Sequence, residues 1–169
     1  VKLKDTERID DLQLKGLKVI QDKNGFCFGI DAVLLANFAK VKKNANVVDL
    51  GTGTGIIPVL IAGKSEAKKI VGVEIQEEVW EMANRTIKLN KLEDRVQIVK
   101  GDKASLDKDL EVHGYHVATS NPPYMHMNGI QNPNDKKAIS RHEVLCNLED
   151  VIRAASRLVM PRGKFFMIH

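Results

Sequence analysis

A glycine-rich segment directly after a short apolar run is the feature that most constrains the fold of this 169-residue chain. Residues 46–50 read Asn-Val-Val-Asp-Leu, which is typical of a buried strand. After Asp49 every second residue is a glycine, at Gly51, Gly53 and Gly55. Glycine tolerates positive φ and carries no side chain that would block a ligand. The pattern predicts a strand, a tight ligand-accessible loop and a helix, which together begin an α/β fold.

Strand-like and helix-like segments alternate along the rest of the chain. The predicted strands are residues 46–50, 69–75, 96–102, 117–120 and 164–169. The predicted helices are residues 56–62, 77–91 and 148–159, with Pro161 and Gly163 ending the last one. Short connections between such elements give a parallel sheet with helices on both faces. We therefore predict an α/β, Rossmann-like fold with a mostly parallel, twisted sheet.

The first part of the chain differs from this pattern and divides the expected organisation in two. Residues 1–44 form an N-terminal segment, and residues 45–169 form the core. Within the N-terminal segment, residues 26–39 predict a loop followed by a helix with Asp31 as its N-cap. An irregular stretch at 125–139 is long enough to predict a functional loop or a disordered one.

Composition excludes several classes of protein and favours none strongly. No apolar run approaches the roughly 20 residues of a membrane span. The two cysteines, Cys27 and Cys146, do not make a disulfide framework, so we expect a cytoplasmic setting and no membrane partner. The net charge of +4 is compatible with an RNA partner without requiring one. His142 and Cys146 are four residues apart, but no further ligands follow at recognisable spacing, so no metal site is predicted.

The glycine spacing favours S-adenosylmethionine (SAM) over a dinucleotide as the cofactor. A dinucleotide loop would show Gly-x-Gly-x-x-Gly, which is absent here. The start of the following helix favours a carboxylate, which SAM carries. Glu74 and Asp102 end the next two strands, where they are expected to accept hydrogen bonds from ribose hydroxyls and from an adenine amino group. The alternatives are that the glycines form only a tight turn, and that Asp49 only orients the loop backbone.

A second motif, Asn121-Pro122-Pro123-Tyr124, follows the fourth predicted strand. An exocyclic amino nitrogen is a poor nucleophile because its lone pair is delocalised. The side-chain oxygen of Asn121 and the carbonyl of Pro122 are placed to accept its two hydrogens, and Tyr124 to stack on the base. Such preorganised acceptors need no general base before methyl transfer. The alternative is an ordinary proline turn that ends a strand.

With both motifs in this order, the chain from about Phe26 onward resembles the class I SAM-dependent methyltransferases of the N6-adenine/N5-glutamine type. A narrower resemblance is to the bacterial tRNA(Val) (adenine-37-N6)-methyltransferase group. It rests on residues 10–12, 28–35 and 140–143. The family sheet has seven strands, so the resemblance implies that the last strands are missing here, with C-terminal truncation of the core.

The resemblance implies a role for each candidate site residue, with SAM as cofactor and tRNA as partner. The segment from Phe28 to Asp31 is expected to close over the cofactor. The complete expected cofactor set is Phe28, Asp31, Asp49, Gly51, Thr52, Gly53, Gly55, Glu74, Ile75, Asp102, Lys103 and Asn121. The expected catalytic set is Asn121, Pro122, Pro123 and Tyr124. The expected substrate contacts are Tyr124, Lys136, Arg141 and His142.

The motifs leave several functions open. The leading hypothesis is methylation of adenine N6 in a tRNA anticodon loop. A protein glutamine-N5 methyltransferase acting on release factors would use the same acceptor motif, although such enzymes usually carry a larger N-terminal domain. A DNA adenine methyltransferase would need a longer recognition region. A non-catalytic SAM-binding subunit is a fourth alternative. Oligomeric state is not encoded in any of these features.

Overall fold

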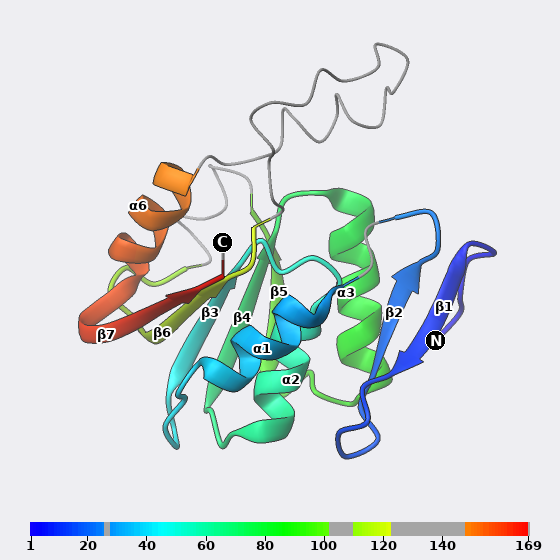
Figure 1. The fold of residues 1–169 in the computed structure, drawn as a ribbon, viewed down its shortest axis with the longest axis horizontal. Helices are drawn as coiled ribbons and strands as arrows, with labels where there is room; N and C mark the ends of the chain where they lie inside the picture. Colours follow the sequence, from blue (N-terminus) through cyan, green and yellow to red (C-terminus); the bar gives the residue numbers. More distant parts are fainter. Residues whose placement is uncertain (26–27, 102–109, 123–147, 169) are drawn as a thin grey trace, which may run out of the picture.

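The parallel order of the central strands is the main result of the computed structural model, which describes residues 1–25, 28–101, 110–122 and 148–168. Five parallel strands lie in the order β5-β4-β3-β6-β7, and β1 and β2 form a separate antiparallel pair (Figure 1). The strands are β1 (Glu7–Asp11), β2 (Lys18–Asp22), β3 (Asn46–Leu50), β4 (Lys69–Glu74), β5 (Val96–Lys100), β6 (Tyr115–Ser120) and β7 (Val159–Met167). The helices are α1 (Ile30–Phe38), α2 (Ile56–Lys64), α3 (Glu77–Leu89) and α6 (Leu148–Leu158). The predicted Rossmann-like α/β fold is confirmed.

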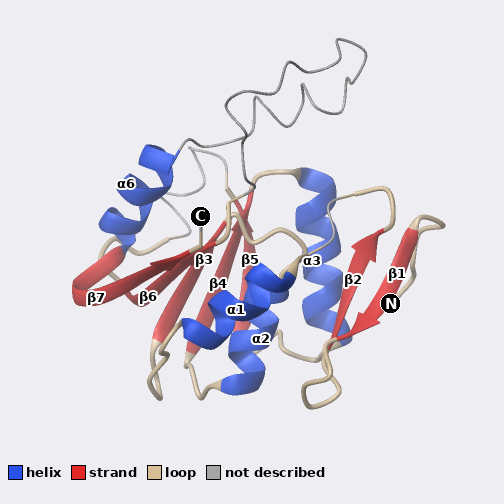
Figure 2. Cartoon of the chain, in the orientation of Figure 1, coloured by secondary structure: helices blue, strands red, loops and turns tan. Residues whose placement is uncertain are grey.

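Helices cover both faces of the five-stranded sheet (Figure 2). On one face, Val47 of β3 packs in a core that includes α1, α2 and α3. On the other face, Val48 packs in a second core that includes α6. Both valines are fully buried although they point to opposite faces of the sheet. Because both faces are covered, the central strands are apolar at consecutive positions and not at alternate ones.

The predicted N-cap of the first helix and the predicted start of the last strand were wrong. The N-cap of α1 is Gly29, and Asp31 lies in the first turn, where a negative charge suits the helix dipole. The helix predicted over 148–159 ends at Leu158, ahead of Pro161 and Gly163 as expected, but β7 begins at Val159 and not at 164, so both residues lie inside this strand. A register shift opposite β6 accompanies them, because proline cannot donate to the ladder and is tolerated at irregular or edge positions.

The sequence did not reveal the antiparallel pair β1–β2, which α3 holds in place. The side chain of Asn90 accepts from the Lys18 N–H at 2.8 Å and donates to the Lys18 carbonyl at 2.7 Å. The Thr86 hydroxyl accepts from the Ile20 N–H at 3.1 Å. These contacts satisfy backbone groups on the edge of β2 that would otherwise need a strand or water.

A buried ion pair fastens the same unit from β1. Arg85 of α3 donates to both carboxylate oxygens of Glu7, at 2.5 and 2.7 Å, and the Glu7 side chain is 1% exposed. The hydrogen bond from Arg85 is the largest cause that lowers the pKa of Glu7, to about 2. Removing either partner would leave the other charge buried without compensation. The pair therefore matters for stability mainly because breaking it is costly.

Replacing Glu7 by Gln is expected to lower the free energy of unfolding at neutral pH by about 2–3 kcal/mol. Since the folded-state pKa of Glu7 is depressed, its contribution is present above its ordinary value of 4.5 and is lost as the pH falls towards 2. Urea titrations of wild type and variant at about pH 7 and pH 3 should show the difference shrinking by more than half.

Glu149→Gln is the matched control, because Glu149 forms an exposed pair with Arg153 on α6. That change is expected to cost less than about 0.5 kcal/mol at either pH. A Glu7→Gln penalty that stays constant with pH would show that ionisation of Glu7 is not the cause.

Candidate active site

The glycine loop and the Asn121 motif begin side by side at one edge of the sheet. Strands β3 and β6 pair in parallel, with Leu50 beside Ser120. The Ser120 hydroxyl donates to the Leu50 carbonyl at 2.9 Å, which fastens the two strand ends together. The next residues are Gly51 and Asn121, so the two predicted motifs leave neighbouring strands at the same level. Carboxyl ends of parallel strands are where such sheets bind ligands.

The glycine loop presents an open backbone surface. Gly51 and Gly53 have φ values of +70° and +57°, and a Cβ on either would meet no atom within 4 Å. Gly55 has φ +84° and caps α2, but a Cβ there would lie 3.6 Å from Ala83 of α3. Gly51 and Gly53 therefore leave room for a ligand, whereas Gly55 is required for the helix start and its contact with α3.

Glu74 points from the end of β4 towards this loop. One carboxylate oxygen accepts from the Gly53 N–H at 2.9 Å, and the other accepts from the Gln76 N–H at 2.8 Å. Burial raises the pKa of Glu74 above its ordinary value, and these amide bonds oppose the rise. Each carboxylate oxygen retains capacity for a further hydrogen bond. The next residue, Ile75, is exposed beside it.

Asp49 is completely buried below the loop. One oxygen accepts from the Thr119 hydroxyl of β6 at 2.6 Å, so the side chain links two strands and does not bond the loop backbone in this structure. The other oxygen and the Thr52 hydroxyl are buried without a hydrogen bond of standard geometry. Burial raises the pKa of Asp49 to about 7; the Thr119 hydroxyl and the nearby Thr52 hydroxyl oppose the rise, and the Glu74 charge adds to it.

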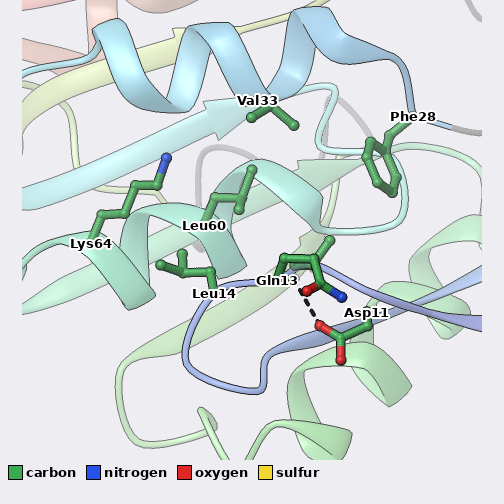
Figure 3. A pocket seen from close by; sticks show the side chains of 8 residues that line it. Asp11, Gln13, Leu14, Phe28, Val33, Leu60 and Lys64 are labelled. Atoms are coloured by element: carbon green, nitrogen blue, oxygen red, sulfur yellow. Dashed lines mark hydrogen bonds between the residues drawn. The ribbon is translucent and has the colours of Figure 1, made fainter.

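Phe28 lies at one end of a pocket of about 400 Å³ between the β1–β2 turn, α1 and α2 (Figure 3). Lys64, the last residue of α2, lies at the other end, with Leu60 between them (Figure 3). Phe28 therefore lies towards the start of α2, where the glycine loop ends. Asp31 follows in the first turn of α1 and is half-buried.

Of the predicted acceptor motif, Asn121 and Pro122 are described and half-buried at the end of β6. The remaining predicted site residues lie outside the described residues: Asp102, Lys103, Pro123, Tyr124, Lys136, Arg141 and His142. Within the described ranges, no group of three or more His, Cys, Asp or Glu side chains is placed to hold a metal ion. No helix among the residues described is both long and apolar enough to cross a membrane.

Three buried polar residues near the candidate site were missed from the sequence. Thr119 and Ser120 fasten β6 to β3, and their signal is a pair of hydroxyl residues directly before Asn121. Gln21 is the third, and it is 1% exposed in β2. Its signal in the sequence is a single amide residue after the apolar pair Val19-Ile20. Alternation along the strand alone does not show which face of β2 the amide occupies.

A parallel sheet with an open glycine loop after β3 and a buried carboxylate after β4 defines a Rossmann-like class I methyltransferase fold. The sequence model of the TRM5/TYW2 methyltransferase domain matches residues 35–156, and the chain belongs to this family. The crystal structure of Pyrococcus horikoshii TYW2 in complex with MeSAdo shares the fold at a TM-score of 0.64 and 20% identity. That likeness covers 93% of this chain and 50% of the other.

Curated relatives support the narrower resemblance. The chain is 28% identical to a tRNA1(Val) (adenine(37)-N6)-methyltransferase from Dyadobacter fermentans, over 90% of this chain and 62% of that protein. It is 30% identical to a protein of the same name from Flavobacterium johnsoniae, over 89% and 64% respectively. The chain thus spans a little less than two thirds of the length of these relatives.

The buried carboxyl of Asp49 makes stability depend on pH in a predictable direction. Because its pKa is higher in the folded state than the ordinary value of 3.8, the unfolded chain ionises first. The contribution of Asp49 to the free energy of unfolding is therefore fully present below about pH 4. It is lost as the pH rises towards 7, by up to about 1.4 kcal/mol per pH unit.

Asp49→Asn should remove this dependence of the free energy of unfolding on pH. The pKa of Glu74 is also raised by folding, so its contribution has the same sign and should remain in the variant. The check is a series of urea titrations of both proteins between about pH 4.5 and pH 7.5. Parallel pH profiles for wild type and variant would contradict a raised pKa for the buried Asp49 carboxyl.

Proposed function

We propose that the chain carries the cofactor-binding and acceptor-binding parts of a SAM-dependent methyltransferase that modifies the exocyclic N6 of an adenine in a tRNA anticodon loop. The observation that carries the proposal is the register of β3 and β6, which starts Gly51 and Asn121 from neighbouring positions. A methyl donor on the glycine loop and an amine at Asn121 would then be neighbours. Cytoplasmic tRNA is the partner that fits this chemistry.

The residues present fit SAM. Gly51 and Gly53 leave an open cradle for it, and the buried Glu74 carboxylate is already oriented at the loop by two amide donors. Such a carboxylate accepts well from ribose hydroxyls. When bound, SAM supplies an electrophilic methyl group on a sulfonium, which leaves as a thioether. Phe28 and Asp31, at the start of α1, are proposed to cover the cofactor.

Asn121 and Pro122 are proposed to hold the acceptor. Their side-chain and backbone oxygens accept the two amino hydrogens, which localises the nitrogen lone pair for attack on the methyl carbon. The nitrogen gains the methyl group and afterwards loses one proton to solvent. Because the acceptors are fixed by the end of β6, they cost no reorganisation during the reaction. Tyr124, Lys136, Arg141 and His142 complete the proposed RNA side of the site.

The names of the curated relatives favour adenine in tRNA over the amide of a release factor. The motif itself fits either planar nitrogen. A direct comparison offers unmodified tRNA and release factors separately to the full-length protein with radiolabelled SAM. Labelled N6-methyladenosine in tRNA is the expected product. Label in a release-factor glutamine, with none in RNA, would overturn the acceptor and leave the cofactor assignment standing.

In the full-length protein, Asn121→Ala is expected to lower kcat/KM on tRNA by at least about 100-fold, because a preorganised acceptor of the amine is lost. Asn121 also belongs to the expected cofactor set, so the Kd for SAM is expected to rise, but by less than about tenfold because the glycine loop is intact. Single-turnover methylation and calorimetric binding provide the two measurements. Asn37→Ala, at an exposed position on α1, is the control and should retain activity. Full activity of Asn121→Ala would remove the basis of the proposed mechanism.

Gly53→Ala is expected to raise the Kd for S-adenosylhomocysteine at least about tenfold, because the new Cβ enters the open cradle. Gly16→Ala is a matched control in the β1–β2 turn: Gly16 also has a positive φ, +71°, and open space around it. Both variants carry the same backbone strain of about 1 kcal/mol. Equal loss of binding in the two variants would attribute the effect to stability and not to the cradle.

A further inference from the structure

Gln21 is a buried polar side chain that joins three segments of the chain. It lies in β2, is 1% exposed, and follows the apolar pair Val19-Ile20. Its amide nitrogen donates to the Asp10 carboxylate of β1, and its amide oxygen accepts from the Phe28 N–H at 2.8 Å. Burial of an amide is costly unless both ends are bonded. Here both ends are bonded, and one partner is a residue at the entrance to α1.

The hydrogen bond to Phe28 ties α1 to a rigid base. The base is the β1–β2 pair, which Arg85, Thr86 and Asn90 fasten to α3. The helix α3 in turn starts three residues after Glu74, whose carboxylate accepts from the Gly53 N–H of the glycine loop. A continuous set of hydrogen bonds and ion pairs therefore leads from the carboxylate side of the loop, through the hairpin, to the backbone of Phe28.

Phe28 lies at the end of the pocket opposite Lys64, the last residue of α2 (Figure 3). A shift of its backbone would move the residues that lead into α1, Gly29 and Asp31 included. A purely structural glutamine would be satisfied by partners within the hairpin. The bond from Gln21 instead reaches out of the hairpin to a residue seven positions along the chain.

We propose that Gln21 is a positioning residue for the cofactor site, which holds the Phe28 backbone in the place where segment 28–31 covers the bound cofactor. It acts through Phe28 and does not touch the cofactor. The inference rests on the proposed function, because it assigns a role within the same site.

The test compares Gln21→Met with Thr86→Val. Each change removes the side-chain acceptor of one backbone N–H, that of Phe28 in the first case and that of Ile20 in the second. Both sites are buried, so similar losses of Tm are expected. The measured quantities are the Kd for S-adenosylhomocysteine in the full-length protein and, without ligand, the amide exchange of residues 28–35.

Gln21→Met is expected to raise this Kd by about tenfold and to speed exchange over residues 28–35, whereas Thr86→Val should keep the Kd within about twofold of wild type. An unchanged Kd for Gln21→Met, or an equal rise for both variants, would overturn the positioning role. Wild-type protein that fails to bind S-adenosylhomocysteine would overturn the proposed function together with this inference.

A milder variant decides the matter if Gln21→Met does not fold. Asp10→Ala removes the carboxylate that orients Gln21, at a position that is 29% exposed and pairs with Arg8. The expected Kd rise is about threefold, with faster exchange at residues 28–35. No change in either quantity would overturn the proposal.

Discussion

The parallel pairing of β3 with β6 is the constraint on which the rest of the site depends. It places Leu50 beside Ser120 and is locked by two hydroxyl donors, Ser120 to a carbonyl and Thr119 to Asp49. These strands are 70 residues apart in sequence, so neither loop can be positioned by its own neighbours. A slip of one residue would turn every side chain of β6 to the opposite face of the sheet, move Thr119 away from Asp49 and separate the two motifs. The position of Asn121 is therefore a property of the sheet.

Two buried carboxyl groups, Asp49 and Glu74, lie beneath and beside the glycine loop and are used differently. Glu74 has a backbone amide on each oxygen and is held as an acceptor facing the loop. Asp49 has one hydroxyl partner and one unpaired oxygen, which is why burial dominates its pKa. The charge of Glu74 adds to the rise in the pKa of Asp49, because ionising Asp49 would place a second negative charge next to it. Of the two carboxyl groups, Glu74 is therefore the one that faces the glycine loop.

The central sheet was predictable because its strands are short, apolar and separated by amphipathic helices, as Val47-Val48 and α3 illustrate. The glycine loop was predictable because its spacing is local. The β1–β2 pair was not, since Glu7, Thr86 and Asn90 reveal their roles only when distant segments meet. Likewise, Pro161 and Gly163 look like helix terminators in sequence, yet they lie in an irregular strand whose register is set by β6. Gln21, Thr119 and Ser120 contribute through single hydrogen bonds, which leave no periodic pattern.

Residues of the β1–β2 pair, outside the five-stranded sheet and its helices, help to position the proposed site. The core alone fixes the glycine loop, Glu74 and Asn121, because these follow directly from β3, β4 and β6. It does not fix Phe28, which precedes α1 and packs against the core formed by α1, α2 and α3. The hairpin supplies that missing constraint, since β2 carries Gln21 and is itself held by α3. Burial of the Glu7–Arg85 pair makes this attachment costly to break, so the entrance to α1 is tied to the helix that follows Glu74.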